Sequence, residues 1–433
     1  MSQLEFARRR RQLMREMGRD TIAVIPAAPE VIRNRDVHYP YRQDSDFLYM
    51  SGFEEPEAVI VLVPHRPQGE YILFCREKDA EKEIWHGRRA GQEGAIEKYG
   101  ADDSFPVADM DEILPGLLEN KEKVYYTMGR YPDFDKHILD WVNQVKQNSR
   151  SGVKAPTEFV SLEFLLHETR LFKTQGEQRL MQKSAKIAAK AHRRAMRACE
   201  PGKTEFQIEA ELLYEFRRQN AQPAYPSIVG GGANGCILHY TENTDTLKDG
   251  DLLLIDAGAE YQGYASDITR TFPVNGKFSS LQRDVYEIVL AAQLAAIEEA
   301  VPGNHWNDPH DAAVKVLTKG LMELGLLKGN RTKLIKEGAY RQFYMHRTGH
   351  WLGLDVHDVG DYKVDNDWRV LEPGMALTIE PGLYISPAKG VPKEFHNIGI
   401  RIEDDILVTR DGNEVLSKDA PKQVDEIEAL MAA

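Results

Sequence analysis

The sequence predicts an α+β protein of two domains, in which the second domain contains an internal duplication. The segments 58–63 and 71–75 are short apolar runs bounded by turn residues, which is typical of buried strands. The later part of the chain alternates long helical patterns with short strand patterns, and this order of elements occurs twice. Mixed strands and helices followed by a repeated helix and strand unit favour two separately folded parts.

A polar segment rich in Ser, Gly and Pro, 148–156, is the candidate end of the first domain. We therefore predict a mixed α/β N-terminal domain over residues 1–160, a linker over 161–173 and a second domain over 174–433. The chain has 433 residues, which is long enough for each part to have its own hydrophobic core.

Capping boxes mark the first two helices of the second domain. Thr174 and Glu177 fit the N-cap and N3 positions of one helix, which should end near Cys199 before a Pro-Gly pair. Thr204 and Gln207 fit the same two positions of the next helix. These signals predict two consecutive helices joined by a short turn.

The same pattern then recurs. A second pair of helices is predicted at 281–300 and 309–324, again with Pro-Gly between them. The segment 249–258 aligns without gaps with 373–382, and each contains an apolar strand that ends in an acidic residue. We interpret this as a duplicated unit with a pseudo-twofold axis.

Acidic residues occupy matching places in the two halves. Asp256 and Glu380 end the aligned strands, and each is followed by a second acid, Asp267 in the first half and Glu403 in the other. A turn at 262–263 would join the strands that carry Asp256 and Asp267. A pseudo-twofold axis would bring all four acids face to face. A chance match between two common α+β patterns is the alternative, and the aligned acids favour duplication.

A cluster of buried acids indicates metal ions. Carboxylates gathered in one pocket cannot all stay ionised unless cations join them, and two divalent cations would neutralise four carboxylates. His346, His350 and His357 fall close together beside Gly349 and Gly353, and imidazole is a common metal ligand and proton shuttle. One nitrogen and many carboxylate oxygens favour Mn²⁺ over structural Zn²⁺. The pattern predicts a two-metal hydrolytic centre. Surface acids and solvated histidines are the alternative.

Composition excludes several function classes. The net charge of −13 argues against nucleic-acid binding, which needs a basic surface. The three cysteines show no paired spacing, which indicates a reduced protein without disulfides. The N-terminus lacks the apolar core of a signal peptide, and no apolar stretch is long enough to span a membrane. The glycine run 230–232, near His239, lacks the lysine of a phosphate loop. We expect a cytoplasmic protein.

Several motifs closely resemble those of one peptidase family. They are Ile255–Gly258, Asp267–Phe272, Gly349–Asp358, Thr378–Gly382 and Ile400–Asp405, with Tyr39–Phe47 and Glu83–Arg89 nearer the N-terminus. The chain resembles the proline-specific aminopeptidases P (Xaa-Pro aminopeptidases) of the pita-bread superfamily, which includes creatinase, prolidase and methionine aminopeptidase. The resemblance covers essentially the whole chain. It implies a creatinase-like N-terminal domain, which serves oligomerisation and substrate access, and a C-terminal pita-bread metallopeptidase domain.

The resemblance also implies a set of metal ligands. Asp267 and Glu403 would bridge two Mn²⁺ ions, Asp256 would complete one ion, and His350 with Glu380 would complete the other. The nucleophile would be a hydroxide between the ions, and Glu380 would be the general base.

Further roles follow from the same resemblance. His346 and His357 would hydrogen-bond the scissile carbonyl or the developing oxyanion, and His239 would line the proline pocket. Arg401 would orient the carboxylates on the substrate side. Trp85 and Asp36 would contact the substrate from a neighbouring subunit of a homodimer or homotetramer. The expected activity is release of the N-terminal residue from peptides with proline in second position.

Other activities fit the sequence less well. Prolidase uses the same metals on X-Pro dipeptides, but the N-terminal motifs favour aminopeptidase P. Creatinase does not keep this metal set. A dinuclear centre could also hydrolyse organophosphate esters as a side activity. Binding modules with this fold typically lose metal ligands, and every ligand position is filled here.

Overall fold

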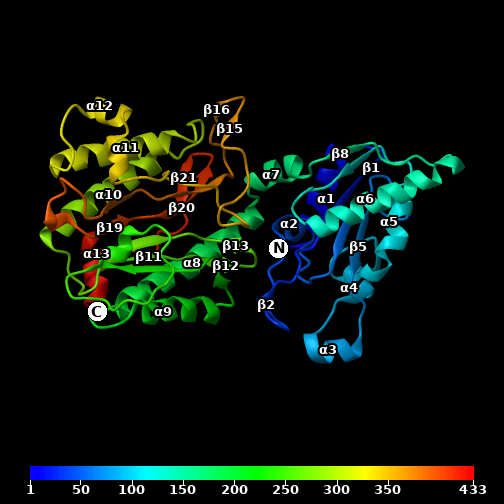
Figure 1. Cartoon of the computed structure of the whole chain (residues 1–433), viewed down its shortest axis with the longest axis horizontal. Helices are drawn as coiled ribbons and strands as arrows, with labels where there is room; N and C mark the ends of the chain where they lie inside the picture. The colour runs from blue at the N-terminus through cyan, green and yellow to red at the C-terminus, as the bar shows by residue number, and fades with distance from the viewer. The chain divides into compact units, whose positions relative to one another are not determined.

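The computed structural model describes residues 1–433 and divides into two compact units (Figure 1). Unit 1 comprises Met1–Thr169 and unit 2 comprises Arg170–Ala433. The division falls inside the segment 161–173 that was predicted as a linker. Most of that segment is a helix, α7 (Glu163–Leu171), rather than an extended connection.

Unit 1 is built on a six-stranded sheet with the strand order β6-β5-β4-β1-β7-β8. Strand β4 is antiparallel to both of its neighbours, and all other pairs are parallel. The strands are β1 (Thr21–Pro26), β4 (Val59–Leu62), β5 (Tyr71–Cys75), β6 (Asp103–Pro106), β7 (Lys123–Tyr125) and β8 (Glu158–Val160). The two apolar runs predicted as strands are β4 and β5, and both are fully buried.

The predicted boundary segment 148–156 lies inside unit 1 rather than at its end. It starts as a short 3₁₀ turn (Asn148–Ser151) and leads into the edge strand β8, which completes the sheet. Its polar composition reflects an exposed connection, because a loop that needs water for its backbone groups is polar wherever it occurs in a domain.

Helices surround this sheet. They are α1 (Gln3–Met17), α2 (Ser45–Ser51), α3 (Ala80–His86), α4 (Gly91–Glu97), α5 (Met110–Leu118), α6 (Pro132–Gln147) and α7. Two pieces remain exposed: α3 has no buried residue, and the hairpin of β2 (Ile32–Asn34) and β3 (Val37–His38) is exposed throughout. These two exposed pieces carry Trp85 and Asp36.

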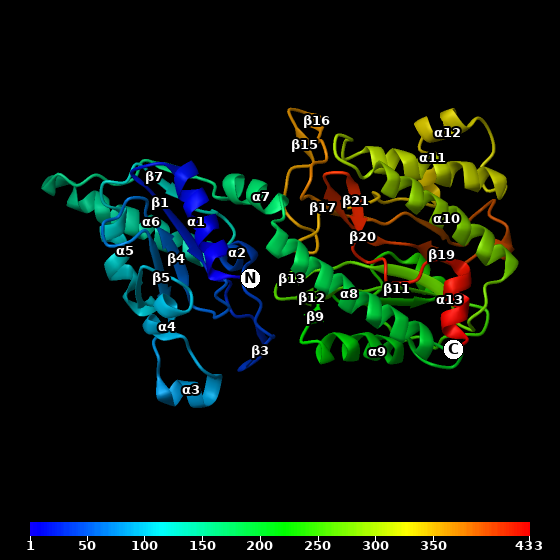
Figure 2. The same cartoon turned by 180° about the vertical axis from the view of Figure 1, so that it is seen from behind.

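Unit 2 contains two pairs of long helices with strands between them (Figures 1 and 2). The first pair is α8 (Gln175–Ala198) and α9 (Glu205–Arg218), and the second is α10 (Ser280–Glu299) and α11 (Asp308–Glu323). The predicted capping box of α8 forms: the Glu177 N–H donates to the Thr174 hydroxyl oxygen, and the Thr174 N–H donates to the Glu177 carboxylate. Two shorter helices are α12 (Arg331–Lys336) and α13 (Val424–Met431).

The strands of unit 2, like its long helices, include one corresponding pair in each half. In the first half β11 (Leu252–Asp256) pairs antiparallel with β14 (Thr269–Pro273), and in the second β17 (Ala376–Ile379) pairs antiparallel with β20 (Asp404–Thr409). The remaining strands are β9 (Gln222–Pro223), β10 (Ile228–Gly231), β12 (Ala259–Tyr261), β13 (Tyr264–Ala265), β15 (Lys363–Val364), β16 (Asp367–Trp368), β18 (Gly382–Ile385), β19 (Ile398–Arg401) and β21 (Gly412–Val415).

The two halves are not equivalent in register. Ile255 and Ile379 correspond in the aligned segments, and they pair with Arg270 and Asp404 respectively. Asp267 precedes the first of these partners by three residues, whereas Glu403 directly precedes the second. The duplication therefore matches the elements and the first pair of acids, while the second pair of acids occupies different register positions.

None of the helices combines the length with the apolar character that crossing a membrane requires.

Two helical glycines test the packing. Replacing Gly320 of α11 with alanine would place a methyl group 2.3 Å from Cγ2 of Ile288 in α10. Because a β-branched side chain is stiff, we expect Gly320→Ala to lower the free energy of unfolding by ~1–3 kcal/mol. Gly116 of α5 has nothing within 4 Å of the same position. Gly116→Ala is the matched control and should raise stability by ~0.5–1 kcal/mol. Urea unfolding measures both, and a stabilising Gly320→Ala would contradict the close α10 and α11 packing.

Candidate metal centre

The four predicted acids lie at strand ends of unit 2. Asp256 ends β11, Glu380 directly follows β17, Glu403 lies between β19 and β20, and Asp267 precedes β14. Asp267 and Glu403 are buried, and Asp256 and Glu380 are partly buried. The turn predicted at 262–263 joins β12 and β13, where both residues have positive φ angles, and it returns the chain toward Asp267.

His350 joins these acids. Its Nε2 lies 3.4 Å from Oδ2 of Asp267 and 3.8 Å from Oε1 of Glu380. One ligand atom from each of Asp267, His350 and Glu403 lies within 4.8 Å of the others. His350 Nδ1 contacts the carbonyl oxygen of Trp351 at 2.9 Å, which leaves Nε2 directed at the carboxylates. The structure thus brings residues from both halves of the duplication into one cluster.

Arg401 and Thr269 hold the carboxylates in place. Arg401 donates from Nη2 to Oδ2 of Asp256 at 2.6 Å and from Nε to the Thr269 hydroxyl at 3.0 Å. That hydroxyl donates in turn to Oε2 of Glu403 at 2.6 Å. The third contact of Arg401 is the hydroxyl of Tyr384, at 2.9 Å from Nη1. One guanidinium therefore contacts Asp256 directly and Glu403 through the Thr269 hydroxyl.

Sequence reasoning missed Tyr225. Its hydroxyl lies 2.6 Å from Oδ1 of Asp256 and also contacts Oδ1 of Asp267. One phenol carries one proton, so it can donate to only one of the two carboxylates at a time. The residue precedes β10 in a Pro-Ala-Tyr-Pro segment that has no catalytic motif, and only the folded chain shows its role.

The pKa values of three of the clustered carboxyl groups are raised. Burial, with the added charges of Asp267 and Asp256, raises the pKa of Glu380 to about 7 against the opposing effect of His350 and Arg401. Burial and Asp256 raise the pKa of Asp267, and burial and Asp267 raise that of Glu403. The pKa of His350 reaches about 9, because contacts with Asp267 and Glu380 outweigh burial. Four carboxylates and one imidazole are a hard donor set, which suits divalent cations that prefer oxygen.

Three further histidines line the site. The His357 ring meets the His350 ring edge to face, with centroids 4.3 Å apart, and burial lowers the pKa of His357, as do nearby His350 and His239. His239 is exposed after the glycine turn that follows β10. His346 Nδ1 lies 3.8 Å from Oε2 of Glu380, and burial and Arg401 lower its pKa to about 4. At neutral pH His346 and His357 are therefore neutral imidazoles.

Trp85 and Asp36 belong to unit 1, whereas the acidic cluster belongs to unit 2. Trp85 is 82% exposed on α3, and Asp36 is exposed in the turn between β2 and β3. Their contribution to a substrate site remains a prediction.

Comparison with known proteins agrees with this arrangement. Residues 179–410 match the Metallopeptidase family M24, and residues 6–125 match the Aminopeptidase P, N-terminal domain. The chain is 47% identical to the Xaa-Pro aminopeptidase of Escherichia coli (strain K12), over 100% of this chain and 98% of that protein. An Arabidopsis thaliana relative, Intermediate cleaving peptidase 55, mitochondrial, is 36% identical over 99% of this chain and 82% of its own length.

Solved structures match the fold closely. The aminopeptidase PepP of Pseudomonas aeruginosa has a TM-score of 0.99 and 57% identity, covering 100% of this chain and 98% of that one. The proline aminopeptidase P II of Yersinia pestis has a TM-score of 0.97 and 49% identity, with 100% coverage of both chains. These matches confirm the predicted fold class, an α/β N-terminal part followed by a pita-bread domain.

The raised carboxyl pKa values predict how pH changes stability once metal is removed with a chelator. Glu380 has a pKa of about 7 in the fold and an ordinary value of 4.5, so its contribution to stability is present below 4.5 and lost as pH rises through 7. Bound cations offset the repulsion. We expect the thermal midpoint of chelated protein to fall increasingly below that of metal-loaded protein between about pH 5 and pH 8. A difference that stays constant over this range would contradict the repulsion.

Proposed function

Since the chain belongs to metallopeptidase family M24 and carries the N-terminal domain of aminopeptidase P, we propose that it releases the N-terminal residue from peptides with proline in second position. The convergence of Asp256, Asp267, His350, Glu380 and Glu403 on one partly buried cluster carries this proposal. The named relatives include Xaa-Pro aminopeptidases that align with the whole chain, and none of those named is a prolidase.

We propose that these five residues would hold two divalent cations, and that Asp267 and Glu403, which lie in the cluster with His350, would serve both. When bound, such ions would lower the pKa of water and polarise the scissile carbonyl. Mn²⁺ suits the oxygen-rich donor set, and one solved structure of Escherichia coli aminopeptidase P is zinc-substituted.

Glu380 is the proposed general base. Its carboxylate, at the end of β17 beside His350, can take the proton of an attacking water and return it to the leaving nitrogen. That transfer matters for an X-Pro bond, because the departing proline nitrogen must gain a proton to leave as an amine.

His357 is the better placed of the two histidines to donate to the developing oxyanion. His346 uses both ring nitrogens: Nδ1 contacts the carbonyl oxygen of Arg347 at 2.7 Å, and Nε2 contacts the Tyr384 hydroxyl at 2.8 Å. A ring nitrogen facing a carbonyl oxygen must carry the proton, so His346 Nε2 accepts from Tyr384. His346 is then engaged with Arg347 and Tyr384, while the exposed His357 is available to the substrate.

Proline in second position calls for recognition by shape. Its nitrogen has no N–H in the peptide, and its ring fixes φ, so a site that polarises the carbonyl does not need the missing donor. His239 is proposed to line the proline-ring pocket from the loop after β10. Arg401 is proposed to act on the substrate side of the carboxylates that it contacts. Trp85 and Asp36 are proposed to reach the substrate from a second subunit of a homodimer or homotetramer, which fits their exposure in unit 1.

We also propose a cytoplasmic location and peptide rather than nucleic-acid partners. The three cysteines, Cys75, Cys199 and Cys236, are all free thiols, which suits a reducing compartment. The acidic net charge of −13 disfavours nucleic-acid partners.

The first experiment compares three substrates for the Mn²⁺-loaded protein: an X-Pro-Y tripeptide, an X-Pro dipeptide and an X-Ala-Y tripeptide. We expect release of X from the X-Pro-Y tripeptide only. Cleavage of the dipeptide alone would identify a prolidase instead. If no peptide is cleaved while metal is bound, turnover of a fluorophosphate would identify organophosphate hydrolysis.

The ligand assignment predicts the effect of two substitutions. His350→Ala and Glu403→Ala should each lower kcat/KM by roughly 10³-fold or more, because each removes several kcal/mol of transition-state stabilisation. Circular dichroism should show that the fold is kept. The surface variants His305→Ala and Glu337→Ala are matched controls and should stay near the parent rate. Near-normal turnover of either ligand variant at saturating Mn²⁺ would show the assignment to be wrong.

A further inference from the structure

The loop that carries His357 has few backbone hydrogen bonds of its own. The loop, residues 352–358, enters with the Leu352 N–H donating to Ala376 at 3.0 Å, and the Gly353 carbonyl oxygen accepts from Ala265 at 2.8 Å. It closes where the Asp358 N–H donates to the carbonyl oxygen of Trp351 at 2.9 Å. Between these points the chain forms bends rather than a helix or strand, so side chains must hold it.

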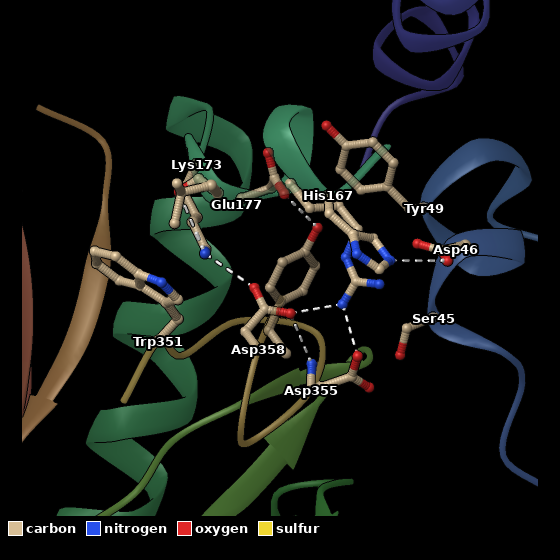
Figure 3. Close-up of polar contacts among 12 residues, drawn as sticks. Ser45, Asp46, Tyr49, His167, Lys173, Glu177, Trp351, Asp355 and Asp358 are labelled. Carbon is tan, nitrogen blue, oxygen red and sulfur yellow. Dashed lines mark hydrogen bonds and ion pairs between the residues drawn. The ribbon is translucent and has the colours of Figure 1, made fainter. Parts of the chain in front are cut away.

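The buried carboxylate of Asp358 anchors the loop. Oδ2 of Asp358 lies 2.9 Å from Nζ of Lys173, and Oδ1 lies 2.6 Å from Nη2 of Arg170 (Figure 3). The exposed fractions of the three side chains are 1% for Asp358, 1% for Lys173 and 2% for Arg170. Asp355 of the same loop also contacts Arg170, at 2.8 Å. Two cations and two anions thus meet at the base of the loop.

The charges favour the ionised carboxylate. Burial alone would raise the pKa of the Asp358 carboxyl, but Lys173 and Arg170 hold it below its usual range. A buried carboxylate with two cationic partners is strongly held, and removal of its charge would leave Arg170 with Asp355 alone and take the carboxylate partner from Lys173.

Hydrogen bonds of its backbone hold Lys173 at the start of α8. Lys173 directly precedes the capping box of α8, its N–H donates to Gly374 at 2.8 Å, and its carbonyl oxygen accepts from the Gln178 side chain at 2.8 Å. Gly353 lets the carboxylate approach, because a methyl group there would lie 2.1 Å from Oδ2 of Asp358 and 3.0 Å from Cε of Lys173. The loop is therefore attached to the start of α8 through Asp358.

We propose that Asp358, clamped between Lys173 and Arg170, is a positioning residue that fixes the neighbouring His357 imidazole against His350 for the transition state. The inference rests on the proposed function, in which His357 contacts the developing oxyanion. A displacement of that ring by about 1 Å can cost about 100-fold in rate while substrate still binds. Loss of the clamp should therefore appear in kcat rather than in KM.

The test is Asp358→Asn, which keeps the size of the side chain and removes its charge. With the X-Pro-Y tripeptide and the metal-loaded full chain, we expect kcat to fall ~10- to 100-fold while KM changes less than ~3-fold. Metal content and far-UV circular dichroism should match the parent. Glu211→Gln, which removes the charge of a surface partner of Arg194, is the matched control and should stay within ~2-fold.

A double variant separates positioning from general damage. If Asp358 acts through His357, Asp358→Asn should add nothing, within ~2-fold, to His357→Ala. Multiplied losses in the double variant, lost metal in Asp358→Asn, or a parent-like kcat would each overturn the inference. If Asp358→Asn does not fold, Gly353→Ala serves instead, because it keeps every charge and displaces the carboxylate; the same kcat loss and the same lack of addition are expected.

The proposed function and the positioning role of Asp358 can be told apart by experiment. A parent protein that cleaves no X-Pro peptide would refute the proposed function and the inference with it. A parent protein that cleaves the tripeptide, with an Asp358→Asn variant of equal kcat, would refute only the positioning role.

Discussion

Four carboxylates held at strand ends impose the constraint on which the catalytic unit depends. Each is brought near the others by strands whose apolar side chains are buried, so moving one carboxylate away would also expose part of the core. Burial, with the neighbouring carboxylate charges added to it, raises the pKa of Glu380, Asp267 and Glu403. The hydrogen bonds of Arg401, Tyr225 and Thr269 relieve part of that strain, and divalent cations would relieve the rest. Burial of the apolar strand residues thereby stabilises a cluster of carboxylates that is suited to cations.

The supporting side chains follow from this constraint. Arg401 occupies in the second half the register position that Asp267 holds in the first, three residues before the partner of the aligned isoleucine. Glu403 likewise corresponds in register to Thr269. Each half therefore contributes one further acid and one supporting donor, and each donor lies beside an acid of the other half. The two halves of the duplicated unit therefore present different side chains to the same site.

The site is held from outside by a second set of buried charges. Asp358 contacts Lys173 and Arg170 at the base of the loop of His357, just as Arg401 contacts Asp256 within the acidic cluster. Buried ion pairs contribute little net stability, because desolvation offsets their attraction, but they fix geometry when every partner is satisfied. Such geometry is what a catalytic loop without regular secondary structure requires.

The sequence by itself determined the parts that depend on local patterns. Strands β4 and β5 follow from apolar runs, and the start of α8 follows from Thr174 and Glu177. The convergence of the acids follows from strand-end positions in a duplicated unit, and the place of His350 among them follows from the resemblance to aminopeptidases P. Only the tertiary structure decided the end of unit 1, because the polar loop 148–156 looks the same inside a domain as between domains. It also decided the roles of Tyr225 and Asp358. Their hydrogen-bond partners lie far away in the chain, and no local pattern encodes a contact that only folding creates.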